Sequence, residues 1–240
     1  MKYIKLSLFL FLTLLFFNLY NLPVYCSSLE ENDNLSKTVY LTFDDGPSKN
    51  TSKILEILKE NDVHATFFVI KPYIESHYDL INAAYNNGNA IGNHTYKHEY
   101  NYVYVSKEAF WDNFNKQQEL IKSVTGEECK IFRFPGGSHN VLVRNAHGDN
   151  FTKDLMEELK SKGITCYDWN VDSGDAKGNN IPASTIYSNV VRESKDKDGN
   201  LKSTAIVLMH DCMTKTTTVE ALPNIIKYFK DQGYTFDILK

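Results

Sequence analysis

Val39-Tyr-Leu-Thr-Phe-Asp-Asp-Gly-Pro47 is a run of β-branched and aromatic residues that stops at two aspartates and a turn. The run predicts a buried strand, and Gly46 and Pro47 favour a turn directly after it. Asp44 and Asp45 are adjacent in this apolar setting, where like charges at close range raise the pKa of one carboxyl. Proteins keep such pairs mainly where a cation or a proton transfer offsets the repulsion. The stretch therefore predicts chemistry at the end of this strand, with a plain turn as the alternative.

Strand-like and helix-like patterns alternate outward from this stretch, which predicts an α/β fold with a parallel sheet. The expected strands are 39–43, 65–70, 90–92, 131–134, 165–171, 204–209 and 234–238. The expected helices are 51–61, 78–86, 107–125, 152–162, 182–192 and 219–232. About 200 residues are too few for eight complete barrel units. A smaller or distorted β/α barrel is favoured, and an open doubly wound sheet is the alternative.

The composition is that of an ordinary globular chain of 240 residues with a net charge of −4. This length allows one large domain or two small ones. No basic block or stripe is present, so we expect no nucleic-acid partner.

The first 28 residues differ in kind from the rest. Lys2 and Lys5 precede an apolar stretch over 6–22, and small residues follow it, an order typical of a secretory signal. The apolar stretch falls short of the roughly 20 residues that usually span a membrane. We expect a signal peptide or membrane anchor over 1–28, a polar linker over 29–36 and one domain over 37–240. The protein is then exported, either secreted or held at the outer face of the membrane by this segment alone.

Export permits disulfide bonds. Cys129 and Cys166 each lie beside a strand-like run, so neighbouring strands could bring them together. A reduced, buried cysteine that packs as a small hydrophobe is the alternative. Cys212 is left over in either case.

Polar side chains gather where the expected strands end, which in parallel β/α folds is the functional edge of the sheet. These residues are Asp44, Asp45, His94, His98, Arg133, Pro135, Asp172, Asp175 and His210. Their coincidence at five strand ends predicts one shared site.

His94 and His98 have i, i+4 spacing, which places both rings on one side if the segment is helical. Two imidazoles and one carboxylate form a facial set with open positions, suited to zinc and to other divalent first-row metals. With Asp45, the pair therefore predicts a catalytic metal site.

These residues resemble the motifs of the polysaccharide deacetylases, the NodB-homology domains of carbohydrate esterase family 4. The resembling stretches are Thr42-Phe-Asp-Asp-Gly-Pro47, His94-Thr-Tyr-Lys-His98, Arg133-Phe-Pro135, Asp172-Ser-Gly-Asp175 and Leu208-Met-His210. The resemblance covers about residues 37–238, and its first two motifs are the most specific. It implies a distorted (β/α)7 barrel that removes acetyl groups from N-acetylated sugars or from acetylated xylan.

The resemblance also implies a role for each matching residue. Asp45, His94 and His98 would bind the divalent metal, with zinc expected first and Co, Mn, Fe or Ni as alternatives. Asp44 would be the general base and Arg133 would hold it by an ion pair. His210 would be the acid, with Asp175 as its charge partner. Leu208 would line the pocket for the acetyl methyl group.

The backbone N–H after Pro135, that of Gly136, could share the negative charge that develops on the acetyl oxygen. Gly136 and Ala176 stand where the family often has aromatic residues. We expect Trp169 or a tyrosine to fill the space.

The expected substrate is an acetylated cell-envelope glycan, first of all the N-acetylglucosamine of peptidoglycan, hydrolysed by a monomer. Chitin oligomers, poly-N-acetylglucosamine and acetylxylan are the alternatives. A non-catalytic glycan-binding protein and an amidohydrolase acting on small amides are hypotheses of other classes.

Overall fold

The computed structural model describes residues 36–72 and 77–240. The expected signal or anchor segment, and all but the last residue of the expected linker, lie outside these residues. Among the described residues, none of the helices is long and apolar enough to cross a membrane.

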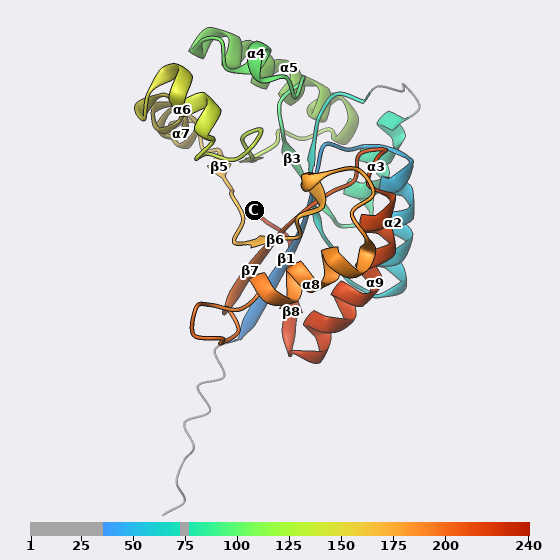
Figure 1. Cartoon of the computed structure of the whole chain (residues 1–240). Helices are drawn as coiled ribbons and strands as arrows, with labels where there is room; N and C mark the ends of the chain where they lie inside the picture. Colours follow the sequence, from blue (N-terminus) through green and yellow to red (C-terminus); the bar gives the residue numbers. More distant parts are fainter. Residues whose placement is uncertain (1–35, 73–76) are drawn as a thin grey trace, which may run out of the picture. The chain divides into compact units, whose positions relative to one another are not determined.

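The strands form one curled parallel sheet whose order follows the chain (Figure 1). They are β1 (Lys37–Asp44), β2 (Thr66–Val69), β3 (Ala90–Asn93), β4 (Ile131–Phe132), β5 (Thr165–Cys166), β6 (Val171–Asp172), β7 (Thr204–His210) and β8 (Tyr234–Phe236). The order β5-β4-β3-β2-β1-β7-β6 is that of a seven-stranded barrel opened between β5 and β6. The prediction of a distorted β/α barrel is therefore confirmed, and the open doubly wound sheet is wrong.

β1 is the central strand and its side chains are buried from Leu41 onward. One edge pairs with β7 along Thr38–Asp44. The other edge is shared, because β8 pairs with the first half of β1 and β2 with the second half. Burial on both faces explains the nearly continuous apolar run of this strand.

The single strand expected over 165–171 is wrong, because this segment forms two strands. β5 pairs with β4, whereas β6 pairs with β7. Between them, Tyr167 N–H still donates to Phe132 O and Asn170 N–H already donates to Ile206 O. The chain itself therefore crosses the opening of the barrel.

Helices follow the strands and cover the sheet in the same circular order, with α8, α9, α2, α3 and α5 packed successively against one another. They are α2 (Lys49–Glu60), α3 (Tyr78–Asn86), α4 (Tyr100–Val103), α5 (Lys107–Thr125), α6 (Val141–His147), α7 (Asn150–Ser161), α8 (Ala183–Glu193) and α9 (Thr216–Asp231), with a 3-10 turn η2 (Asp175–Lys177). The short helices α4 and α6 were not expected from the sequence.

Local sequence sets the helix ends that matter for the site. Ser48 is the N-cap residue directly before α2. Its hydroxyl accepts from Asn50 N–H, and the Thr51 hydroxyl accepts from Ser48 N–H. This reciprocal cap fixes the chain directly after the two aspartates. α5 is capped at its start by Ser106, whose hydroxyl accepts from Ala109 N–H. It is capped at its end by Gly126 with φ 82°, a conformation that favours glycine.

Two apolar clusters fill the space around the sheet. The larger lies between the sheet and its covering helices. The smaller is rich in aromatic rings and lies under α4, α6 and α7, where Phe110, Phe132 and Phe134 contact one another. It supports the loops that follow β3 and β4.

The structure contains no bond between Cys129 and Cys166, since both thiols are free. The strand register explains this, because Cys166 lies opposite Phe132, three residues along from Cys129. That offset is roughly 10 Å along a strand. Burial raises the pKa of the Cys129 thiol to about 11, as expected for the reduced alternative.

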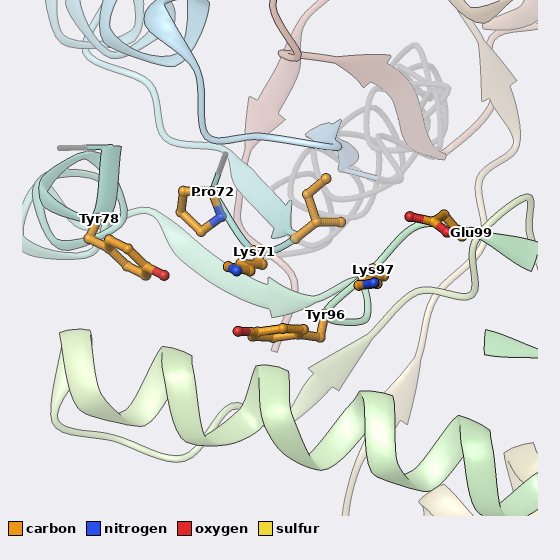
Figure 2. Close-up of a pocket in the computed structure, with 7 residues that line it drawn as sticks. Lys71, Pro72, Tyr78, Tyr96, Lys97 and Glu99 are labelled. Carbon is orange, nitrogen blue, oxygen red and sulfur yellow. The ribbon is translucent and has the colours of Figure 1, made fainter. Parts of the chain in front are cut away.

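A cavity of about 500 Å³ opens beside the carboxyl ends of β2 and β3 (Figure 2). Lys71, Tyr78, Tyr96 and Lys97 contribute to its lining, and Lys71 Nζ lies 5.3 Å from the centre of the Tyr96 ring. The cavity thus presents cations and aromatic rings next to the loop that carries His98.

Candidate active site

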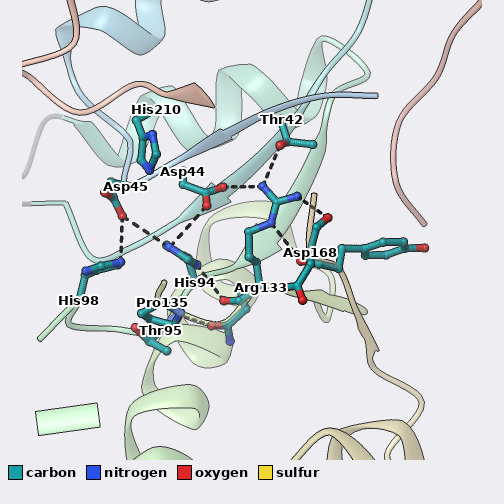
Figure 3. A network of polar contacts seen from close by, with 12 residues as sticks. Thr42, Asp44, Asp45, His94, Thr95, His98, Arg133, Pro135, Asp168 and His210 are labelled. Carbon is teal, nitrogen blue, oxygen red and sulfur yellow. Dashed lines mark hydrogen bonds and ion pairs between the residues drawn. The ribbon is translucent and has the colours of Figure 1, made fainter. Parts of the chain in front are cut away.

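The strand register brings the predicted site residues to one edge of the sheet. Asp44 at the end of β1 is the register partner of His210 at the end of β7. Asn93 at the end of β3 is the partner of Phe132 in β4, so the next residues, His94 and Arg133, follow at the same level. The predicted residues at the ends of β1, β3, β4 and β7 therefore converge (Figure 3).

Asp45, His94 and His98 form a compact set of atoms that could hold a metal ion, called the metal set below. One ligand atom from each residue lies within 4.8 Å of the other two. Asp45 Oδ1 is 3.5 Å from His94 Nε2 and 3.6 Å from His98 Nε2. Figure 3 shows both rings directed at this carboxylate.

The segment His94–His98 is not helical, so the helical explanation of the His-x-x-x-His spacing is wrong. The two rings meet because Thr95 takes φ 72°, a conformation rare for a β-branched residue. Thr95 N–H donates to Asn93 Oδ1 at 2.8 Å, and the Thr95 hydroxyl donates to Lys97 O at 3.0 Å. A constrained loop, and not a helix turn, thus brings the two rings together.

A buried asparagine on α5 holds the same loop from outside. Asn113 Oδ1 accepts the N–H groups of Tyr96 and Lys97 at 2.9 and 2.8 Å. Asp45 also has a positive φ, 69°. Non-glycine residues in this region cost of order 1–3 kcal/mol each and cluster at functional sites. Of the two residues strained in this way, Asp45 belongs to the metal set and Thr95 directly follows His94, another member.

The donor set fits a divalent metal ion. Asp45 Oδ1 is buried and has no hydrogen-bond partner among the described residues, so it is an acceptor without a donor. His94 Nδ1 lies 2.8 Å from Arg133 O, which puts the ring hydrogen on Nδ1 and leaves the Nε2 lone pair for a ligand. Burial, followed by the charge of His98, lowers the pKa of His94 to about 3, so the ring is neutral at pH 7. Two ligands about 2.0–2.1 Å from a tetrahedral zinc lie roughly 3.4 Å apart, close to the spacing in this set.

Asp44 is held by Arg133, which is completely buried. Arg133 Nη1 donates to Asp44 Oδ1 at 2.9 Å and to Thr42 Oγ1 at 2.7 Å. Its Nε donates to Tyr167 O and its Nη2 to Asp168 O. The other carboxylate oxygen, Asp44 Oδ2, lies 3.7 Å from His94 Nε2. One oxygen of Asp44 is thus fixed by the guanidinium while the other faces the metal set.

His210 lies across the site and is paired with Asp175. His210 Nδ1 is 2.7 Å from Asp175 Oδ1, while His210 N–H and the Thr218 hydroxyl donate to Asp175 Oδ2. Burial lowers the pKa of His210, but the hydrogen bond and charge of Asp175, with the charges of Asp44 and Asp45, outweigh it and raise the pKa to about 9. Burial opposes the ionised form of Asp175, yet its bonds to His210 and Thr218 bring its pKa below the usual value.

Pro135 and Gly136 form a tight turn after β4. Gly136 has φ 76°, and Gly137 N–H donates to Phe134 O at 2.8 Å. Tyr104 Oη donates to Pro135 O at 3.0 Å. Leu208, also predicted as a substrate contact, is buried on β7 and is the register partner of Thr42 and Asp172.

Three other predictions concern residues at this edge of the sheet, namely Asp172, Trp169 and a tyrosine next to Gly136. Asp172 Oδ1 accepts Gly174 N–H at 2.7 Å, which is a turn-stabilising contact. Trp169 lies against Gly137 and 5.7 Å from the Arg133 guanidinium. The position next to Gly136 is taken by Tyr100, whose Oη stands 2.2 Å from where a Cβ at 136 would be. A tyrosine thus fills the space there.

Asp211, which follows His210 directly, was not predicted from the sequence. Its carboxylate is buried and accepts the Thr51 hydroxyl at 2.5 Å, while its N–H donates to Asp44 O. Burial, with the charges of Asp45 and Asp44, raises the pKa of Asp211 to about 7. The only sign of Asp211 in the sequence was its position directly after His210, a predicted catalytic residue. Thr42 and Asn113 gave none, because a threonine in a strand and an asparagine in a helix are ordinary.

A second recess, of about 360 Å³, borders the metal set on the side of the β1 and β7 loops. Asp45, Pro47, Cys212 and Met213 help to line it. The cluster therefore has space beside it for more than a single acetyl group.

Comparison with known proteins gives the family. The polysaccharide deacetylase family model matches residues 31–150. The chain is 31% identical over 210 residues to a peptidoglycan-N-acetylglucosamine deacetylase of Bacillus cereus, covering 86% of this chain and 70% of that protein. It is 30% identical over 202 residues to the peptidoglycan-N-acetylmuramic acid deacetylase PdaA of Bacillus subtilis, covering 83% of this chain and 69% of that protein.

Among solved structures, the catalytic domain of a peptidoglycan N-acetylglucosamine deacetylase from Eubacterium rectale superposes with a TM-score of 0.77 at 33% identity. The match covers 85% of this chain and 89% of that domain. The fold and the converging motif residues agree with these similarities. The chain belongs to the polysaccharide deacetylase family, whose members are hydrolases.

Proposed function

We propose that this protein hydrolyses the N-acetyl group of a cell-wall glycan, with the N-acetylglucosamine of peptidoglycan as the substrate. One observation carries the proposal. Asp44, held by Arg133, and His210, held by Asp175, lie at the ends of the adjacent strands β1 and β7, next to the Asp45, His94 and His98 set. An amide needs both a base and an acid for hydrolysis, and a site for binding alone needs neither.

Asp45, His94 and His98 would hold the ion, for which we propose zinc because two imidazoles and one carboxylate suit it. When bound, the ion supplies Lewis acidity that lowers the pKa of water and polarises the acetyl carbonyl. All other steps belong to side chains and backbone groups of this chain.

Asp44 accepts a proton from water through Oδ2, because its Oδ1 is already bonded to Arg133. The water oxygen then forms a bond to the acetyl carbon, and Gly136 N–H donates to the carbonyl oxygen as negative charge develops there. The C–N bond breaks as His210 passes its proton to the amine. A pKa of about 9 keeps His210 protonated at neutral pH, as a general acid requires.

The choice of glycan is supported by the relatives. The Bacillus cereus protein is named for N-acetylglucosamine, the Bacillus subtilis protein for N-acetylmuramic acid, and both for peptidoglycan. A cell-wall substrate also agrees with the signal-like first 28 residues, so we propose that the enzyme works outside the cytoplasm. All the proposed site residues come from one chain, and the proposal requires no second copy.

The test is acetate release from a panel of glycans by the zinc-loaded protein, with chelator-treated protein as the control. The panel contains peptidoglycan, chitin oligomers, poly-N-acetylglucosamine, acetylxylan and a small N-acetylated amide. Faster chelator-sensitive release from peptidoglycan than from the others supports the proposal. Tight binding of glycans without any acetate release would show a non-catalytic binding protein instead. Turnover confined to the small amide would show an amidohydrolase.

A further inference from the structure

Gly136, whose N–H is the proposed donor to the acetyl oxygen, carries no side chain. Tyr100, from another segment, occupies the space next to it. Gly136 has φ 76°, and a Cβ built there would lie 2.2 Å from Tyr100 Oη and 2.3 Å from Asn140 Nδ2. A side chain at this position would require Tyr100 and Asn140 to move, and it would be strained at this φ. The tyrosine hydroxyl and the Gly136 backbone therefore form one continuous surface.

Tyr100 also contacts the metal-binding side of the site. It is the first residue of α4, and its ring centre lies 5.8 Å from that of His98. Its ring also makes an edge contact with Tyr104, with 5.8 Å between the ring centres, and Tyr104 Oη in turn donates to Pro135 O. Tyr100 thus bridges the loop that carries His98 and the turn that carries the Gly136 N–H, and it is only partly buried.

The environment of the hydroxyl leaves its hydrogen available. Tyr100 Oη and Asn140 Nδ2 lie beside the same point next to Gly136. The Asn140 Nδ2 donates to Pro135 O at 3.4 Å, and its Oδ1 accepts Leu142 N–H at 2.9 Å. Among the described residues, no hydrogen bond takes up the hydrogen of the Tyr100 hydroxyl. A phenolic hydroxyl both accepts and donates, so the O–H of Tyr100 remains free to point into the site.

We propose that Tyr100 is a catalytic residue of the deacetylation, whose hydroxyl donates to the acetyl oxygen together with Gly136 N–H. The inference rests on the proposed function. Tyrosine hydroxyls are among the donors that form oxyanion sites. The hydrogen bond strengthens as the carbonyl oxygen gains charge, so it lowers the barrier more than it tightens substrate binding.

The test is Tyr100→Phe, which keeps the ring and removes the hydroxyl. We expect kcat on N-acetylglucosamine oligomers or peptidoglycan to fall by roughly 10- to 100-fold, with KM changed by less than about 2-fold. Zinc affinity, measured by competition with a chromogenic chelator, should be unchanged. Tyr102→Phe is the matched control, because Tyr102 lies on the same short helix, is 39% exposed and stacks under Lys97. It should behave as the unmodified protein.

Three results would overturn the role of Tyr100. They are an unchanged kcat in Tyr100→Phe, a rise in KM without a loss of kcat, and a loss of kcat matched by a loss of zinc affinity. The last would mean that the ring merely supports His98. If the unmodified, zinc-loaded protein releases no acetate from any glycan, the proposed function itself fails and the role of Tyr100 fails with it. Turnover by the unmodified protein with no effect of Tyr100→Phe refutes the role of Tyr100 alone.

Discussion

His210 Nδ1 lies 2.7 Å from Asp175 Oδ1, and the other oxygen of that carboxylate is bonded to His210 N–H and to the Thr218 hydroxyl. The carboxylate is therefore fixed by three contacts before it acts on the imidazole. It can hold the ring in one orientation and one protonation state. This arrangement makes the pH dependence of the enzyme predictable.

Asp175→Asn should lower the pKa of His210 from about 9, because the hydrogen bond and charge of Asp175 are the main effects that raise it. The alkaline limb of kcat/KM should then move to lower pH by at least one unit, with little change in metal content. The measurement is kcat/KM from pH 5 to 10. Asp172→Asn is the control, since Asp172 bonds only to Gly174 N–H among the described contacts. An alkaline limb that stays in place would contradict the assignment of His210 as the acid.

The same pair makes a pH-dependent contribution to stability. The folded pKa of His210, about 9, exceeds the ordinary value of 6.5, so the stabilisation is complete below pH 6.5 and is lost as pH rises through 9. Its size is roughly 3 kcal/mol. The free energy of unfolding of the unmodified protein should therefore approach that of Asp175→Asn between pH 7 and 9.5. Urea unfolding curves at pH 6.5 and 9.5 measure this, and a constant difference would refute it.

The two adjacent aspartates should respond differently to substitution. Asp44→Asn keeps an acceptor for Arg133 and leaves the metal set complete, so bound zinc should remain near one equivalent while kcat falls by about 10³-fold or more. His94→Ala removes a ligand and should lose the metal. Metal analysis after dialysis, with acetate-release assays, tests both. Equal metal loss in the two variants would contradict the separate roles.

The buried ion pair between Arg133 and Asp44 should be costly to break. Arg133→Met leaves a buried carboxylate without its partner, which costs about 3–5 kcal/mol. The double variant Arg133→Met with Asp44→Asn should recover part of this loss in unfolding free energy while remaining inactive. Denaturation of the single and double variants, compared with the unmodified protein, gives a double-mutant cycle for this ion pair. No recovery in the double variant would show that Arg133 acts through its contacts with Thr42 and the backbone instead.

Titration of Asp211 should lower the free energy of unfolding of the metal-free protein as pH rises. Its folded pKa of about 7 lies above the ordinary value of 3.8. The folded state therefore binds the proton more tightly, and stability declines between these two values by at most roughly 4 kcal/mol. Asp211→Asn keeps an acceptor for Thr51 and removes the titration. Chelator-treated Asp211→Asn should gain stability relative to the unmodified protein from pH 5 to 8, and an equal slope in both would refute this.

Most of the fold could be predicted because its signals are local. Alternation of apolar runs with helix patterns identified β1, α3 and α5 nearly to the residue. The segment 165–171 misled the prediction because its composition suits one strand, whereas the division into β5 and β6 depends on which neighbour each half pairs with. The non-helical path between His94 and His98 could not be predicted for a similar reason. The spacing of two histidines says that they can meet but not by which backbone path.

The site was predictable only where motif residues lie at strand ends. Thr42, Asn113 and Asp211 hold those residues in place but have no distinctive spacing. Tyr100 lies two residues after His98 and became recognisable only when its hydroxyl was seen against Gly136, 36 positions along the chain. Contacts between distant loops leave no pattern in a single sequence.

The register that makes Asp44 the partner of His210 has an evolutionary consequence. Neighbouring strands lie about 4.8 Å apart wherever backbone hydrogen bonds join them, so the sheet itself sets the spacing of the proposed base and acid. The loops around them can lengthen, shorten or exchange residues without disturbing that spacing. Recognition of the sugar can thus diverge while proton transfer stays constant, and one scaffold can be adapted to many acetylated polymers.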